Sequence, residues 1–90
     1  MLRETTLTIG TSGGTIYDFE KAGDILGLHS HGLEDLHWTI IARGSFRVWG
    51  DDFDQTVSAG AILDWEPGVN HGFSALEDNS RLINIIKNRL

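Results

Sequence analysis

The sequence predicts an all-β protein, an antiparallel sandwich or barrel, on three observations. Short apolar or alternating segments recur every eight to twelve residues along the chain, a spacing typical of β-sandwiches and barrels. Glycine, aspartate and asparagine separate these segments, and no stretch shows a helical period of useful length. No repeat or linker divides the 90 residues, so a single domain over residues 1–90 is expected.

Nine strands are expected, each bounded by turn residues. The glycine-rich residues 10–14 are expected to form a loop, and residues 20–24 and 50–52 turns. Arg43-Gly44 is read as a two-residue hairpin connection in which Gly44 supplies a positive φ. The expected strands cover residues 2–9, 15–19, 25–31, 38–42, 45–49, 55–57, 61–65, 71–76 and 81–87.

Composition excludes several classes of partner. A net charge of −6 disfavours nucleic acid and anionic membranes, because both are bound through cationic contacts. No apolar run is long enough to span a membrane, and the N-terminus lacks the apolar core of a signal peptide. A cytoplasmic protein is therefore expected. The absence of cysteine rules out disulfides and thiolate metal sites.

The four histidines fall where strand alternation gathers them on inward faces. His29 and His31 share a face, because side chains at i and i+2 of a strand point the same way. Gly27 and Ile25 are expected on that face, and Gly27 either leaves room for a ligand or marks a bulge. His37 begins the proposed hairpin and His71 opens a later strand, so three strands would deliver four imidazoles to one cavity.

The same alternation predicts the lining of this cavity. If the hairpin turns at Arg43-Gly44, the inward residues Thr39 and Ile41 lie opposite Val48 and Phe46. Phe73 follows His71 on its face, and Trp65 precedes the loop that leads to it. The predicted pocket residues are Gly27, Thr39, Ile41, Phe46, Val48, Trp65 and Phe73.

Two sequence motifs resemble those of the cupin superfamily. The first runs Gly23, five residues, His29-x-His31, five residues, His37, six residues, Gly44; the second runs Gly60, five residues, Glu66-Pro67-Gly68, two residues, His71. The resemblance covers residues 23–75 and implies a jelly-roll-like cupin barrel, a double-stranded β-helix with a metal inside. In three places the chain departs from the usual cupin pattern: His37 replaces a glutamate, Glu66 a proline and Ala75 an asparagine.

The third ligand stays open at this point. His37 has the right spacing to Gly44 and the right strand parity, whereas Glu34 and Asp35 lie in the preceding loop, from which either carboxylate could coordinate. The resemblance implies the ligand set His29, His31, His37 and His71. The competing interpretation is a barrel without metal, whose histidines are hydrogen-bonded in a polar cavity.

An all-imidazole set favours Zn, Cu, Ni or Fe(II), because no carboxylate is present to favour Mn or Mg. Four neutral ligands leave the full +2 charge on the ion, which strengthens it as a Lewis acid and attracts anionic oxygen ligands. A saturated tetrahedral site would be structural, whereas an open position would permit catalysis.

Other residues carry weaker predictions. Trp38 and Trp49 are expected to oppose each other on the outer face of the hairpin, forming either a homodimer interface or a cross-strand pair covered within the chain. Glu66 and Tyr17 are candidate proton carriers.

The sequence thus predicts a metal-dependent enzyme acting on a small organic molecule by oxygenation, isomerisation or cyclisation. The alternatives are a small-ligand-binding or sensory domain in which the metal is structural.

Overall fold

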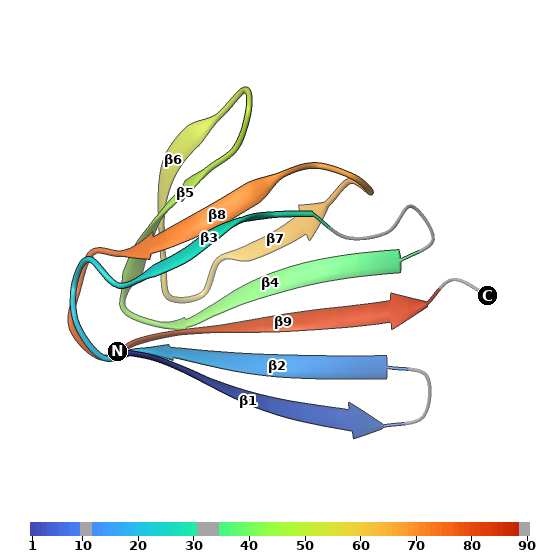
Figure 1. Ribbon diagram of the computed structural model, residues 1–90, viewed down its shortest axis with the longest axis horizontal. Coiled ribbons are helices and arrows are strands. Elements are labelled where there is room, and N and C mark those ends of the chain that lie inside the picture. Colours follow the sequence, from blue (N-terminus) through green and yellow to red (C-terminus); the bar gives the residue numbers. More distant parts are fainter. Residues whose placement is uncertain (10–11, 31–34, 89–90) are drawn as a thin grey trace.

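The chain forms two antiparallel sheets that face each other, as the sequence predicts (Figure 1). The computed structural model describes residues 1–9, 12–30 and 35–88. Within them lie nine strands and no helix: β1 (Leu2–Ile9), β2 (Ser12–Phe19), β3 (Ile25–His29), β4 (Asp35–Arg43), β5 (Ser45–Trp49), β6 (Asp54–Ser58), β7 (Ile62–Trp65), β8 (His71–Ala75) and β9 (Ser80–Asn88). Sheet A has the order β1-β2-β9-β4-β7, and sheet B the order β3-β8-β5-β6. None of the described residues forms a helix long and apolar enough to cross a membrane.

The strand boundaries follow the predicted ones closely except that β2 and β4 each begin three residues earlier than predicted, at Ser12 and Asp35. β2 begins at Ser12, so Gly13 and Gly14 lie in the β1–β2 ladder instead of in a loop. Composition marks glycines as turn residues, but ladder hydrogen bonds need only the backbone, which glycine supplies. The predicted loop over residues 10–14 is therefore too long.

The predicted hairpin between residues 38 and 49 is wrong. β4 pairs with β9 and β7 in sheet A, whereas β5 pairs with β8 and β6 in sheet B. Gly44, with a φ of 80° as predicted, carries the chain from one sheet to the other. The alternation was correct, because the inward faces of both strands are buried. These two inward faces lie opposite each other in different sheets and do not belong to neighbouring strands of one sheet.

Aromatic and aliphatic side chains from both sheets fill the space between them. Phe19 of sheet A meets Phe46 of sheet B edge to face, with 4.8 Å between ring centroids. Phe46 also contacts Phe73 within sheet B. The fully buried core consists of Phe19, Ile41, Phe46, Val48, Phe73, Ala75 and Leu82.

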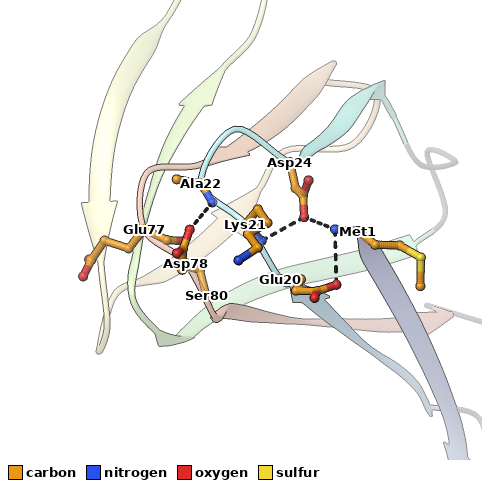
Figure 2. A network of polar contacts seen from close by, with 8 residues as sticks. All are labelled: Met1, Glu20, Lys21, Ala22, Asp24, Glu77, Asp78 and Ser80. Carbon is orange, nitrogen blue, oxygen red and sulfur yellow. Dashed lines mark hydrogen bonds and ion pairs between the residues drawn. The ribbon is translucent and has the colours of Figure 1, made fainter.

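A polar network closes the end of the sandwich where the chain starts (Figure 2). The Met1 amine and the Lys21 N–H both donate to Asp24, at 2.7 and 3.1 Å. The Ala22 N–H donates to Asp78 at 2.8 Å, which joins the β2–β3 turn to the β8–β9 turn. The bonded amine and the backbone N–H hold the pKa of Asp24 below its usual value. Contacts between loops and the N-terminus thus stabilise this end of the sandwich.

Asp18 on β2 forms a two-point contact with Arg81 on β9, with N–O distances of 2.7 and 3.3 Å. The Arg81 hydrogen bond is the main cause that holds the pKa of Asp18 below its usual 3.8. A carboxyl group whose pKa is lower in the folded chain stabilises the fold at pH values above its pKa in the unfolded chain. This stabilisation is lost as the pH falls through the pKa of the folded chain.

Asp18→Asn is therefore expected to lower the melting temperature by a few degrees at pH 7, the modest effect of a partly exposed ion pair. The difference from the original chain should shrink below about pH 4 and vanish at lower pH. Thermal denaturation at several pH values measures it. An equal difference at pH 7 and pH 2 would contradict this assignment.

Candidate metal centre

Three histidines converge at the end of the sandwich opposite the Met1 network. His29 ends β3, His37 lies near the start of β4, and His71 begins β8, and Figure 1 shows these three strand ends on one side. His29 and His71 are direct partners in sheet B, with 4.5 Å between ring centroids. His37 approaches His71 from sheet A at 5.1 Å. His31, the fourth predicted ligand, lies outside the described residues.

The two ring separations match those of imidazoles that share one metal ion. A metal–nitrogen bond of about 2.0–2.1 Å places each ring centroid roughly 3.2 Å from the ion. Two such rings at angles of about 90–109° have centroids roughly 4.5–5.2 Å apart. The observed separations of 4.5 and 5.1 Å fall within this interval. The centroid separations of the pairs His29–His71 and His37–His71 are therefore compatible with a shared ion.

Backbone carbonyls fix the orientation of two of these rings. His29 Nδ1 lies 2.8 Å from the Gly27 carbonyl oxygen, and His71 Nδ1 lies 3.0 Å from that of Val69. A carbonyl oxygen only accepts, so Nδ1 carries the proton in both rings and Nε2 carries the lone pair of the neutral form. Histidine ligands in metalloproteins are oriented by this same kind of contact.

Of the remaining candidate ligands, the structure describes only the backbone of Asp35. Among the side chains that the structure describes, no group of three or more histidine, aspartate or glutamate residues is arranged to hold a metal. Glu34 lies outside the described residues, like His31. Asp35 was predicted to lie in a loop, but it is the first residue of β4 and pairs with Asn88. Its side chain is not described.

A bulge in β3 changes the face that was predicted for its first residues. The pairing of β3 with β8 shifts between Leu26 and His29. Leu26 packs against the core, whereas Ile25 is 57% exposed and Gly27 is exposed. The prediction that Ile25 and Gly27 share the inward face of His29 is therefore wrong, because the bulge shifts the alternation. Of the two roles considered for Gly27, the bulge agrees with this pairing.

Trp65 connects the histidines to a buried polar chain. Its indole stacks on His71, with centroids 4.0 Å apart and planes 11° from parallel. Its Nε1–H donates to Thr39 Oγ1 at 2.9 Å, and the Thr39 hydroxyl donates to Asn84 Oδ1 at 2.6 Å. This chain runs from β9 through β4 to β7 and sets the plane of Trp65 against His71.

Asn84 was missed in the sequence, although a signal was present. It stands between Leu82 and Ile86 at an inward position of β9 and is 3% exposed. A polar residue at such a position needs a hydrogen-bonding partner. The alternation could have indicated a polar contact inside the sandwich.

The predicted pocket residues occupy different places. Ile41, Phe46, Val48 and Phe73 are core residues, and Thr39 is fully buried in the polar chain described above. Trp65 and Val48 also line a cleft of about 260 Å³, the rest of which is formed by Phe53, Gln55, Ile62, Leu63 and Asp64. The cleft lies beside Trp65, and none of its lining residues is a histidine. Substrate contact by the predicted residues stays a prediction.

Of the two candidate proton carriers, Tyr17 lies apart from the histidine rings. Tyr17 faces inward on β2, but its partner Leu82 pairs with Ile41, four residues along β4 from His37. Two strand spacings and four residues separate the Tyr17 and His37 Cα atoms by roughly 16 Å. Burial, and then the charge of Glu4, raise the pKa of Tyr17. Glu66 is exposed in the turn after β7.

Trp38 and Trp49, predicted to oppose each other, lie on different sheets. Trp38 is on the outer face of β4, and its partners are Asp64 and Ile85. Trp49 is on β5, where its ring covers Gly72 and Arg47 lies 5.0 Å from the ring centre. The predicted tryptophan pair is therefore wrong, because β4 and β5 do not pair. Homodimerisation itself stays a prediction.

Comparisons with known proteins identify the fold. No family model and no curated protein sequence matches the chain. Among solved structures, KdgF from Halomonas sp. is 19% identical with a TM-score of 0.85, over 99% of this chain and 80% of that one. An RmlC-like cupin from Desulfovibrio desulfuricans is 24% identical with a TM-score of 0.84, over 96% of this chain and 81% of that one. The chain thus has the cupin fold, as its two motifs implied.

A third similar structure bears on metal binding. Oxalate decarboxylase from Bacillus subtilis, described as having Mn(II) centres, is 24% identical with a TM-score of 0.74. The match covers 87% of this chain but only 21% of that one. The fold of this chain is therefore one in which a metal centre occurs.

Proposed function

We propose that this chain is a metal-dependent cupin that holds one divalent transition metal with His29, His31, His37 and His71. The observation that carries the proposal is the approach of two imidazoles to His71 at 4.5 and 5.1 Å, from opposite sheets. The Nδ1 contacts of His29 and His71 support it, since they leave Nε2 as the ligand atom of each ring. The Mn(II) centres of the similar oxalate decarboxylase support it further.

The substrate that fits this donor set is a small organic molecule with an anionic oxygen. When bound, Zn, Fe, Ni or Cu would supply Lewis acidity, with its full positive charge left on the ion by neutral ligands. The chain orients the His71 ring by stacking Trp65 on it, and the Thr39–Asn84 hydrogen bond fixes Trp65 in turn. We propose an oxygenase, isomerase or cyclase reaction in the cytoplasm, with Glu66 as the candidate proton carrier that follows Trp65.

A second candidate function is a ligand-binding or sensory cupin with a structural metal. Burial of the ligands favours it: His37 is 2% exposed and His71 1%. A closed site leaves no room for substrate, and in that case the cleft beside Trp65 would hold the ligand without contacting the metal.

Metal analysis of the chain purified without added metal tests the proposal. We expect about one equivalent of transition metal per chain, bound at pH 7.5 and released as the pH falls below about 6.5, because imidazole must be neutral to coordinate. Element-specific mass spectrometry after dialysis at each pH gives the occupancy. Full retention at about pH 4.5, or no binding of Zn(II), Co(II), Ni(II) and Cu(II) by the metal-free chain, would contradict an all-histidine centre.

The spectrum of the Co(II)-loaded chain separates the two candidate functions. Five- or six-coordinate Co(II) with exchangeable water supports an enzyme, since a position then remains for substrate. Four-coordinate Co(II) without exchangeable water supports the structural metal of the second candidate.

A further inference from the structure

The cleft beside Trp65 is bordered by the edge strands of the two sheets. β7 ends sheet A and β6 ends sheet B, and these two strands do not pair with each other. The cleft has a volume of about 260 Å³, and five of the seven described residues that line it are apolar. Pockets for drug-sized ligands have about 300–1,000 Å³. This cleft is smaller, so it takes a molecule of roughly one ring.

Two aromatic side chains form one wall of the cleft. The rings of Phe53 and Trp65 have centroids 5.8 Å apart and planes 34° from parallel. Both residues pack against the buried core, and the hydrogen bond from Trp65 to Thr39 fixes the plane of the indole. Aromatic side chains hold flat apolar groups, and their ring faces also attract cations. This wall therefore suits an apolar ring that carries a positive charge.

The open edge of β7 adds hydrogen-bond acceptors to the cleft. The Ile41 N–H donates to the Ala61 carbonyl oxygen at 2.9 Å, between β4 and the start of β7. Backbone groups alternate in direction along an antiparallel edge strand, so those of Leu63 also point toward β4. Those of Ile62 and Asp64 point to the open edge of the sheet instead, and both residues line the cleft. Their carbonyl oxygens can therefore accept hydrogen bonds from a ligand bound there.

The charge of the cleft decides which ligand fits. Asp64 is the one charged residue among the described residues that line it, and its side chain is exposed. No described side chain forms an ion pair with Asp64. Gln55, the other polar lining residue, is the direct partner of Val48 and shares its inward face. Because the whole chain also has a net charge of −6, the cleft attracts cations and repels anions.

We propose that the cleft beside Trp65 binds a small organic ammonium ion with an apolar body of about one ring. The body lies against Phe53 and Trp65, and the ammonium group donates to Asp64 at the exposed rim. An ammonium group has N–H donors and no acceptor, which matches a carboxylate and edge carbonyl oxygens. The assignment rests on the second candidate function, for which it names the ligand class. It requires no metal, because none of the described lining residues is a histidine.

NMR titration of the isotope-labelled chain, as purified and after EDTA treatment, tests the proposal with three probes: benzylamine, benzyl alcohol and phenylacetate. We expect benzylamine to shift the signals of Gln55, Leu63 and the Trp65 indole N–H saturably, with a dissociation constant of about 1–10 mM. Benzyl alcohol lacks the charge and should bind about two- to fivefold more weakly. Phenylacetate should bind more weakly still. EDTA should leave the benzylamine shifts unchanged.

Three outcomes of the titration are decisive. No saturable shift with benzylamine, or phenylacetate binding as tightly as benzylamine, overturns the proposal. Shifts that disappear when the metal is removed from a folded chain overturn it too, because they assign the probe to the metal centre. If the chain binds no metal at all, the metal-dependent function fails while the benzylamine shifts persist, so the two failures are distinguishable.

Two matched variants of the chain as purified test the charge, and they decide alone if the metal-free chain does not fold. Asp64 and Asp52 are both exposed aspartates, but only Asp64 lines the cleft. Asp64→Asn is expected to raise the dissociation constant of benzylamine about two- to fivefold, the effect of losing one exposed ion pair, and to leave that of benzyl alcohol unchanged. Asp52→Asn should change neither constant. Equal effects of the two variants, or equal weakening of both probes by Asp64→Asn, overturn the proposal.

Discussion

Gly44→Ala is expected to lower the free energy of unfolding by about 2–5 kcal/mol. Two costs combine at this position. The φ of 80° lies in the left-handed region, where an L side chain is strained. The added Cβ would also overlap the Oγ of Ser80 and lie 2.9 Å from its Cβ, and Ser80 is fully buried at 0% exposure.

Gly60→Ala separates these two costs. Gly60 has a φ of 99°, and a Cβ added there meets no atom within 4 Å. It should therefore lose only the backbone part, about 1–2 kcal/mol. Urea denaturation of both variants measures the difference. Ser80→Gly in the Gly44→Ala background should restore part of the loss by removing the overlapping atoms, and equal losses at Gly44 and Gly60 would contradict the role assigned to Ser80.

The position of Gly44 explains why the sequence predicts the strands but not their pairing. Alternation over residues 38–49 places Thr39, Ile41, Phe46 and Val48 on buried faces, and the structure confirms this burial. A glycine between two strands looks the same whether the chain turns back within one sheet or crosses to the other. The pairings of β4 with β9 and of β5 with β8, and the approach of Gly44 to Ser80, 36 residues away in the sequence, distinguish the two.

The histidine cluster was predictable in part for a similar reason. His37 and His71 were placed on inward faces by alternation and by spacing to glycines, and both are buried. The bulge between Leu26 and His29 was not predictable in position, because it depends on how β3 pairs with β8. The stacking of Trp65 on His71 was also hidden, since it arises from two strands in different sheets.

His37→Gln is expected to lower the affinity for Co(II) or Zn(II) at least about a hundredfold, more than the 10- to 100-fold typical of residues that only orient a ligand. Glutamine is close to histidine in size, so the buried position beside His71 stays filled. Metal affinity is measured by competition with a chelating dye. Glu34→Gln and Asp35→Asn are the matched controls and should change the affinity little.

The opposite result would assign the third ligand to one of the two carboxylates at or just before the start of β4. If Glu34→Gln or Asp35→Asn removes the metal and His37→Gln does not, a carboxylate is the third ligand and the centre is less electropositive than proposed. His37→Glu adds a test of metal preference, because it introduces the carboxylate that is usual at this position in cupins. A carboxylate favours Mn(II) over its competitors more than imidazole does. The ratio of Mn(II) to Zn(II) affinity should therefore rise in His37→Glu, and an unchanged ratio would show that residue 37 does not touch the metal.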